Sequence, residues 1–364
     1  MLNEETGLLT VSVDEAAKML SKSYINLLRR GIAFKKFPAV MLWGPPGVGK
    51  SQGVREIADI IENTCGKKVV ITDVRLLLFD PVDLRGIPTS NQDKTLAVWL
   101  KPEIFHMDDN ADVVNILFLD EISAAPPSVQ ASAYQIVLDR AVGEHKLPDN
   151  CIVIAAGNRV TDKSVAYTMP RALANRMCHI EIKCDYDSWH DWAVRTDIHE
   201  YVIGFLEYNS ALLMKNMTDS NLAFTTPRSW EMVSNILKCS GCDIDECFSL
   251  ISGCIGYNTA VSFKIWAELY KKIPSVKEIF EGKHIETPKE KELLIALLSS
   301  MVAYARKNPK KKPIDNSINY ACELPWWFRN SLLHDYSNVK EILPVLKKNS
   351  IYLASVGDVS NDRT

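Results

Sequence analysis

The stretch from Gly44 to Ser51 carries residue types that could bind a phosphate group. It reads GPPGVGKS, the pattern G-x-x-x-x-G-K-S, and the apolar run AVML stands just before it. Glycines let the backbone curl so that successive N–H groups face a bound anion. Lys50 would reach the β- and γ-phosphates, and the hydroxyl of Ser51 would face Mg²⁺. We therefore predict a site for a nucleoside triphosphate and Mg²⁺ built by Gly44, Pro45, Pro46, Gly47, Val48, Gly49, Lys50, Ser51 and Gln52.

Two adjacent carboxylates end a second apolar run. The segment NILFLDEIS places Asp120 and Glu121 directly after four apolar residues. Beside a bound triphosphate, Asp120 would hold Mg²⁺ through water, and Glu121 would polarise the attacking water as a general base. A strand that only meets solvent at an acidic turn would look the same. The phosphate loop upstream favours the catalytic interpretation.

A neutral amide ends a third apolar run. The segment CIVIAAGN finishes in Asn158, whose side chain could orient water and sense the loss of a γ-phosphate. Asparagine also favours turns and caps, so a purely structural role stays open for this residue.

These candidate residues need a sheet that brings their strand ends together. Short apolar runs rich in Val and Ile alternate with helical patterns, which is typical of strands buried on both faces of a parallel sheet. The carboxyl ends of such strands form the edge where α/β proteins bind ligands. We predict an α/β core whose five parallel strands lie at residues 39–43, 69–74, 115–120, 151–158 and 178–183.

The segments around this core have helical patterns. Ser12 and Glu15 form a capping box that opens a helix ending at Gly31. Thr287, Pro288 and Glu290 indicate another helix start, and KNPKKKP (307–313) indicates a solvated linker. We predict four parts: an N-terminal helix (1–36), the α/β core (37–185), a helical lid (186–270) and a C-terminal helical region (271–364).

Composition narrows the functional classes. The chain has 364 residues, 47% of them hydrophobic, and a net charge of −3, which is ordinary for a globular protein. No apolar run reaches the ~18–20 residues of a membrane span. The acidic N-terminus lacks the order of a signal peptide, and an odd count of nine cysteines favours reduced thiols. We expect a cytoplasmic protein without a membrane partner, for which nucleic acid is the less favoured ligand.

Four cysteines lie close together in the sequence. Their spacing, C-x2-C-x4-C-x6-C, fits no common zinc or iron–sulfur pattern, and the seven histidines show no ligand spacing. Free cysteine packs as a small hydrophobe. We favour core packing over a metal site for Cys239, Cys242, Cys247 and Cys254.

Taken in order, several segments resemble the AAA+ ATPases, and within them the MoxR-type group that includes RavA, CbbQ and the gas-vesicle ATPase. The resemblance covers about residues 10–270 and rests on GPPGVGKSQ, LFLDEISAAPPSVQ, AAGNR, MPRALANRMCHIEI and FTTPRSWE. It implies an αβα P-loop core with a five-stranded parallel sheet, followed by a helical lid. The C-terminal region 271–364 lies outside the family pattern.

The resemblance also assigns roles to further residues. Asn158 matches the residue called sensor 1, and Arg228 in TPRSWE matches the sensor 2 arginine, which reaches the γ-phosphate of its own subunit. Arg176 is the first candidate for the trans-acting arginine finger, and Arg171 is the second. The alternative for each arginine is an ordinary surface charge. Segments 78–89 and 140–150 match an insertion facing a ring pore and the hairpin before sensor 1, although both could be plain surface loops.

A site completed by a neighbouring subunit implies a ring, and family analogy implies a hexamer. The same analogy implies ATP hydrolysis that remodels or activates a partner protein, commonly one with a von Willebrand factor A domain. An AAA+ motor or loader on nucleic acid, such as a restriction-system subunit, is the alternative, and a slow nucleotide-gated scaffold is a third class.

In the tail, consecutive aromatic residues at 326–328 cannot all enter one helical stripe. We favour packing of that tail onto the lid over a partner contact.

Overall fold

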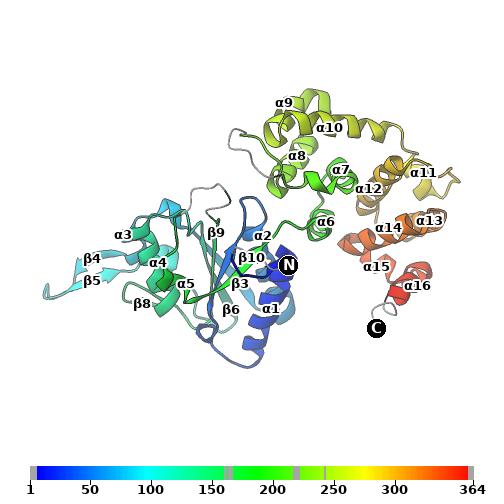
Figure 1. Cartoon of the computed structure of the whole chain (residues 1–364). Helices are drawn as coiled ribbons and strands as arrows, with labels where there is room; N and C mark the ends of the chain where they lie inside the picture. Colours follow the sequence, from blue (N-terminus) through cyan, green and yellow to red (C-terminus); the bar gives the residue numbers. More distant parts are fainter. Residues whose placement is uncertain (1–5, 160–161, 163–166, 216–221, 242, 360–364) are drawn as a thin grey trace. The chain divides into compact units, whose positions relative to one another are not determined.

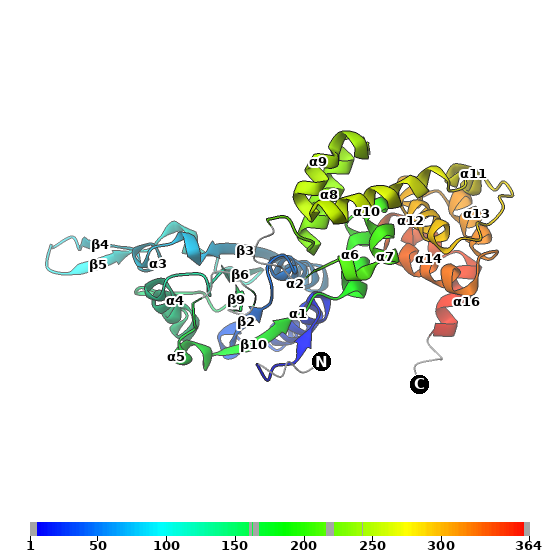
Figure 2. The same cartoon turned by 45° about the horizontal axis from the view of Figure 1, so that its top comes forward.

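The computed structural model describes residues 6–159, 162, 167–215, 222–241 and 243–359. The chain divides into two compact units, Met1–Asp185 and Tyr186–Thr364. Figures 1 and 2 show both units from two directions.

A parallel sheet of six strands organises the first unit. The sequence predicts five strands, and the sixth is a correction: β1 has only two residues, too few to give a pattern, and pairs with β10 through Thr10 opposite Glu181. The other four pairings are also parallel. In spatial order the strands are β1 (Thr10–Val11), β10 (Met177–Ile182), β2 (Ala39–Trp43), β9 (Cys151–Gly157), β6 (Val113–Asp120) and β3 (Lys68–Arg75).

Helices cover both faces of this sheet, as Figure 1 shows. On one face α1 (Val13–Arg29) and α2 (Lys50–Cys65) pack against alternate strand residues such as Ile116 and Phe118. On the other face α4 (Pro127–Asp139) packs against Leu117 and Leu119. Each such buried side chain contributes ~1.5–3 kcal/mol relative to an exposed one. Burial on both faces explains why β6 appears in the sequence as a continuous apolar run.

The predicted capping box of α1 is confirmed. The backbone N–H of Glu15 donates to Ser12 Oγ over 3.1 Å, and the Ser12 N–H donates to Glu15 Oε2 over 2.7 Å. The helix ends at Arg29, with Gly31 in the left-handed region at φ 62° just beyond it. The start of α1 is therefore fixed two residues after β1.

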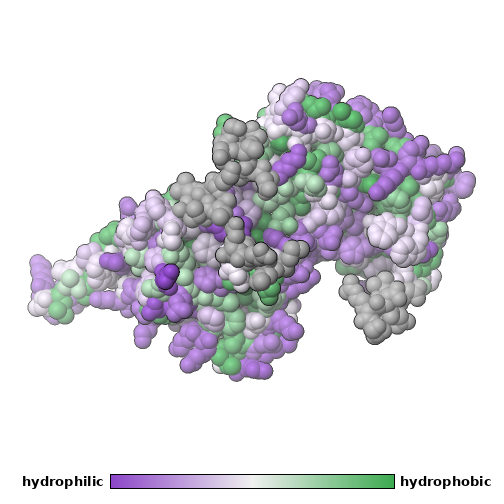
Figure 3. Space-filling view, in the orientation of Figure 1, coloured by the Kyte–Doolittle hydropathy of each residue, from purple (hydrophilic) through white to green (hydrophobic). Residues whose placement is uncertain are grey.

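Two small antiparallel ribbons extend from the sheet. After a short helix α3 (Pro81–Arg85), β4 (Ile87–Ser90) pairs with β5 (Ala97–Leu100), and β7 (Ala141–Val142) pairs with β8 (His145–Lys146). The second ribbon confirms a hairpin within residues 140–150. The first continues the insertion predicted at 78–89 and is labelled in Figure 1. Figure 3 shows apolar and polar residues side by side at its end, and its exposed apolar residues are Ile87, Leu96 and Leu100.

The described part of the second unit is entirely helical. Its longest helix, α12, is buried along most of its length and packs on α7. The helices are α6 (Tyr186–Arg195), α7 (Glu200–Tyr208), α8 (Pro227–Cys239), α9 (Ile244–Ile255), α10 (Tyr257–Ala267), α11 (Val276–Glu281), α12 (Lys291–Lys307), α13 (Lys311–Ala321), α14 (Trp326–Asn338), α15 (Leu343–Leu346) and α16 (Ser350–Val359). The boundary that we predict at residue 270 lies between helices of this one unit and stays a prediction.

Three expectations for this unit need correction. Helix α12 begins at Lys291, so Thr287 does not cap it. Helix α13 begins at Lys311 inside the predicted linker, because Pro313 is tolerated in a first helical turn. The tail packs on the predicted lid, with α14 against α6, but its aromatic residues do not take part as expected. Trp326 and Trp327 are 63% and 72% exposed, since the buried side of α14 is formed further along by Leu332, Leu333 and Tyr336.

The cysteine cluster is partly described. Cys247 and Cys254 share α9; Cys247 is buried, and its thiol donates to the Asp243 carbonyl over 2.9 Å. Cys239 is exposed at the end of α8, and Cys242 lies outside the described residues. Packing therefore accounts for Cys247, and within the described residues no group of three or more His, Cys, Asp or Glu is arranged to hold a metal ion.

Candidate functional site

The phosphate loop joins the end of β2 to the start of α2. A Cβ on Gly44 would lie 2.8 Å from the Ile182 carbonyl oxygen, so only glycine allows this close approach to β10. Gly49 has φ 106° and is the N-cap of α2, where no side chain provides a capping hydrogen bond. The positive end of the helix is thus left for an anion, as phosphate binding requires. The loop fits the phosphates of a nucleotide.

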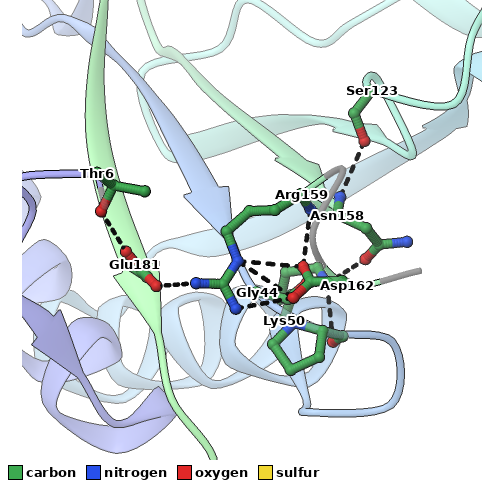
Figure 4. A network of polar contacts seen from close by, with 9 residues as sticks. Thr6, Gly44, Lys50, Ser123, Asn158, Arg159, Asp162 and Glu181 are labelled. Atoms are coloured by element: carbon green, nitrogen blue, oxygen red, sulfur yellow. Dashed lines mark hydrogen bonds and ion pairs between the residues drawn. The ribbon is translucent and has the colours of Figure 1, made fainter. Parts of the chain in front are cut away.

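Lys50 links this loop to the end of β9. Its Nζ donates to the carbonyls of Gly44 (2.5 Å) and Pro45 (3.1 Å) and to Asn158 Oδ1 (2.8 Å), as Figure 4 shows in part. The ammonium group is therefore held at the entrance of the loop by oxygen acceptors. The predicted phosphate-binding lysine and the predicted sensor amide lie within hydrogen-bonding distance of each other.

Two oxygen ligands suited to Mg²⁺ lie side by side. The Ser51 hydroxyl donates to Asp120 Oδ2 over 3.1 Å, across 69 residues of sequence. Magnesium prefers hard oxygen ligands and usually takes only one or two from the protein, with water and phosphate completing the shell. Ser51 and Asp120 fit that habit and would hold the ion.

Asp73 is an acidic group near this pair that sequence reasoning missed. It lies on β3, which is paired with β6. Burial, and then the nearby Asp120 carboxylate, raise the pKa of Asp73. A cation between the two acids would relieve this repulsion. The signal that could have found Asp73 is its place near the end of a predicted strand.

Glu121 occupies an unusual backbone conformation. Its φ is 56°, in the left-handed region that costs a non-glycine residue ~1 kcal/mol or more. Its N–H donates to Asp120 Oδ1 over 2.9 Å, and the next residue, Ile122, donates to the Ala156 carbonyl of β9. The strand ends of β6 and β9 therefore hold Glu121 in a strained turn, a feature that clusters at functional sites.

Asn158 is fixed by another residue that sequence reasoning missed. Its backbone N–H donates to Ser123 Oγ over 2.9 Å. A Cβ at the preceding Gly157 would lie 2.7 Å from that same oxygen, so glycine is needed for the serine to approach. The tips of β6 and β9 are joined in this way, and Ser123 could have been suspected only from its position shortly after the two acids.

The two candidate finger arginines lie on another part of the first unit. Arg171 begins the short helix α5 (Arg171–Ala174), and Arg176 follows it. Both are exposed; the Arg176 guanidinium donates to the Ala172 carbonyl and lies 4.8 Å from the centre of the Tyr134 ring. Within the described part of the chain, both stand outside the hydrogen-bond network of Lys50. Their role stays a prediction.

A histidine connects this arginine-bearing segment to the strand before the loop. Trp43 Nε1 donates to His179 Nδ1 over 2.9 Å, and the two rings stack. His179 Nε2 therefore carries the proton and donates to the Ala174 carbonyl over 2.8 Å. No pattern in the sequence predicts this link.

Arg228 lies in the second unit. It is exposed in the first turn of α8, whose N-cap Thr226 forms a capping box with Ser229. Its predicted reach toward a γ-phosphate joins residues of both units, and it remains a prediction.

Comparison with known proteins agrees with this geometry. The family described as "ATPase family associated with various cellular activities (AAA)" matches residues 39–179, which include the phosphate loop, both acids and Asn158. Over 163 residues the chain is 25% identical to the chaperone MoxR1 of Mycobacterium tuberculosis. Residues 39–179 therefore match an AAA-type ATPase module, and this part of the chain is similar to a MoxR-type protein. The aligned stretch is 44% of the chain and spans 38% of the length of MoxR1.

Solved structures resemble the chain only loosely. A point mutant of RuvB from Thermotoga maritima is 16% identical with a TM-score of 0.37, and 81% of this chain covers 86% of that one. NtrX of Brucella abortus in complex with ATP is 14% identical with a TM-score of 0.37, and 91% of this chain covers 69% of that one. Among the described helices, none is long and apolar enough to cross a membrane.

Proposed function

We propose that this chain hydrolyses ATP in a Mg²⁺-dependent reaction. The single observation that carries the proposal is the meeting of four side chains at the strand ends: Lys50 is bonded to Asn158, and Ser51 is bonded to Asp120. When bound, ATP supplies the phosphoryl group and Mg²⁺ neutralises its developing charge.

The side chains then divide the work. The residues from Gly44 to Gln52 wrap the phosphates, and Lys50 leaves its carbonyl acceptors for the β- and γ-oxygens. Ser51 and Asp120 hold the metal ion. Glu121 accepts a proton from the attacking water, a step that typically contributes ~10²–10⁴ in rate. Asn158 orients that water and responds when the γ-phosphate departs.

A complete site needs a second copy of the chain. Exposure of Arg171 and Arg176 supports a role for one of them, Arg176 before Arg171, as a finger reaching a neighbour's ATP. A guanidinium suits that role because its charge is fixed and its fork matches phosphate. Arg228 would act within its own subunit. Contacts of this head-to-tail kind close into rings, and we propose a hexamer.

We further propose that the ring remodels or activates a partner protein. The match to MoxR1, a protein named as a chaperone, supports this, whereas a von Willebrand factor A domain in the partner, common among partners of the family, rests on the family resemblance alone. The eight described cysteines are all free, which supports a reducing, cytoplasmic location.

The first experiment replaces the proposed general base. Glu121→Gln should retain ATP binding and ring assembly while turnover falls ~10²–10⁴-fold. Glu62→Gln on the exposed side of α2 is the matched control and should turn over normally. Lys50→Ala should instead lose nucleotide affinity. Normal hydrolysis by Glu121→Gln would remove that residue from its role.

Two further measurements test the ring and the partner. Arg176→Ala subunits mixed with Lys50→Ala subunits should recover part of the activity that each lacks, and failure to recover would count against a trans-acting Arg176. Stimulation of ATPase activity by a protein partner supports the remodelling proposal. Stimulation by DNA would favour a nucleic-acid motor, and an intact site with no turnover under any condition would favour a nucleotide-gated scaffold.

A further inference from the structure

The residue after Asn158 is held by two carboxylates. The Arg159 backbone N–H donates to Asp162 Oδ2 over 2.7 Å, and its Nη2 donates to Asp162 Oδ1 over 2.8 Å. Its Nη1 forms an ion pair with Glu181, as Figure 4 shows. The guanidinium is therefore engaged on two sides by acidic groups of its own subunit.

The Arg159–Glu181 pair crosses the strand that leads into the phosphate loop. Glu181 lies on β10 and Arg159 follows β9, and β2 lies between those two strands in the sheet. Trp43, the last residue of β2, stands opposite Glu181 on one side and opposite Gly157 on the other. The pair thus ties together the strand ends that flank the start of the loop.

This pair is unlike an ordinary surface ion pair. The Glu181 side chain is only 3% exposed, so its carboxylate depends on partners within the protein. One oxygen faces Arg159, and the other accepts a hydrogen bond from Thr6 Oγ1 over 2.8 Å. Because each oxygen has its own partner, the orientation of the carboxylate is fixed. The carboxylate in turn fixes the orientation of the Arg159 guanidinium.

The consequence falls on Asn158. Its own N–H is held by Ser123, and the next N–H, that of Arg159, is held by Asp162. Both peptide groups that set the direction of the Asn158 side chain are therefore fixed by side chains. The amide oxygen so placed meets Lys50 Nζ at 2.8 Å.

We propose that Arg159 is a positioning residue that acts through Asn158, with Glu181, Asp162 and Thr6 holding its guanidinium in place. This inference rests on the proposed ATP hydrolysis. The requirement is for arginine in particular, because a lysine carries the charge but lacks the fork that engages two carboxylates at once. Thr6 connects the segment before β1 to this group of residues through Glu181. We call the group formed by Arg159, Glu181, Asp162 and Thr6 the brace around Arg159.

A double-mutant cycle tests the inference. Arg159→Ala should lower turnover at saturating ATP by ~10–100-fold, the cost of a misplaced catalytic group, with a smaller change in nucleotide dissociation constant. Arg159→Lys should restore only part of it. Asn158→Ala combined with Arg159→Ala should be no slower than Asn158→Ala alone, because one residue acts through the other.

The binding readout is independent of turnover. If Asn158 senses the γ-phosphate, Asn158→Ala and Arg159→Ala should lose the same share of the preference for ATP over ADP, measured with a fluorescent nucleotide. Lys183→Met, which removes a partly exposed ion pair with Asp185 just after β10, is the control and should leave that preference unchanged. Thr6→Val is a milder variant at an exposed residue: it removes the hydrogen bond to Glu181 and the one that Thr6 Oγ1 accepts from the Leu8 N–H. A turnover loss of a few-fold is expected.

The outcomes separate the two proposals. Wild-type protein that hydrolyses no ATP under any condition overturns the proposed function. A wild type that does hydrolyse ATP, with an Arg159→Ala variant that matches it or with additive losses in the double variant, overturns only the positioning role of Arg159.

Discussion

Two buried acids, one in each unit of this chain, are surrounded in opposite ways. In the first unit Glu181 is 2% exposed, and both of its oxygens have partners, Arg159 and Thr6. In the second unit Asp335 is 4% exposed, and among the described residues its Oδ1 accepts no hydrogen bond. The Nδ1 atom of His190 lies 3.7 Å from this oxygen, beyond hydrogen-bonding distance. The first unit surrounds its buried acid with close donors, and the second does not.

Burial in the second unit favours the neutral forms of three titratable side chains, those of Asp335, Glu207 and His190. It raises the pKa of Asp335 to about 7, and it raises the pKa of Glu207 to about 7, with the Asp335 charge adding to that shift. It also lowers the pKa of His190. These groups lie on α14, α7 and α6. Burial therefore favours the neutral forms of Asp335 and Glu207, which lie where these helices pack together.

The largest expected effect comes from a substitution in the first unit that removes a charge from the proposed site. Asp120→Asn removes a charged oxygen ligand, so ATP hydrolysis should fall ~10²–10³-fold, about 3–4 kcal/mol of barrier. Steady-state ATPase assays over a Mg²⁺ titration measure it. Asp93→Asn, on an exposed part of the β4–β5 ribbon, is the control. Unchanged Mg²⁺ dependence in Asp120→Asn would show that this carboxylate holds no metal.

The next-largest expected effect comes from replacing a buried acid of the second unit by its neutral amide. It is a gain in stability, whereas the first effect is a loss of activity. The folded pKa of Asp335 lies above its ordinary value of 3.8, so the folded state binds the proton more tightly than the unfolded state. The contribution of Asp335 to stability is therefore greatest at low pH and is lost as pH rises from about 4 to 7, by at most ~1.4 kcal/mol per pH unit. Asp335→Asn should flatten this slope and raise stability at pH 8 by ~1–3 kcal/mol.

Urea unfolding followed by tryptophan fluorescence measures this slope. Six of the eight tryptophans lie in the second unit, at positions 189, 192, 230, 266, 326 and 327. Asp245→Asn is the control: that carboxylate is exposed, and its hydrogen bond with Lys264 lowers its pKa. An Asp335→Asn slope between pH 5 and pH 7 that equals that of the wild type would contradict the assignment.

The smallest expected effect tests whether the two units unfold independently of each other. Ser12→Ala removes the N-cap of α1 and should cost ~1 kcal/mol. Hydrogen–deuterium exchange should increase across residues 13–29, while exchange in the second unit stays at the wild-type rate. Ser23→Ala, a partly exposed position within the same helix, should change exchange little. Faster exchange in the second unit would mean that the units unfold together.

Much of the first unit could be predicted because its signals are contiguous. The loop, the acids and Asn158 each stand at the end of an apolar run, and parallel strands bring such ends to one edge. The brace around Arg159 could not be foreseen, because Glu181 becomes its neighbour only through the order of strands β10, β2 and β9. Strand order depends on packing across the whole sheet and leaves no local pattern.

The second unit is harder to predict for a different reason. Helix periodicity identifies helices but gives little information about their starts, so the prediction that Thr287 caps α12 is wrong. The exposed Trp326 and Trp327 show that an aromatic run does not imply burial when it falls in a first helical turn. Asp335 and Glu207 could not be singled out, because burial of an acid depends on which helices surround it.

The pairing of β1 with β10 has a consequence for synthesis on the ribosome. Thr10 must wait for Glu181 before its backbone can pair, a separation that spans nearly the whole first unit. At ~5–20 residues per second, the ribosome needs roughly ten seconds or more to add those intervening residues. During that interval the early helix α1 and the loop after β2 are already made while their edge of the sheet is missing, so a nascent chain stalled before residue 177 should expose this edge to chaperones.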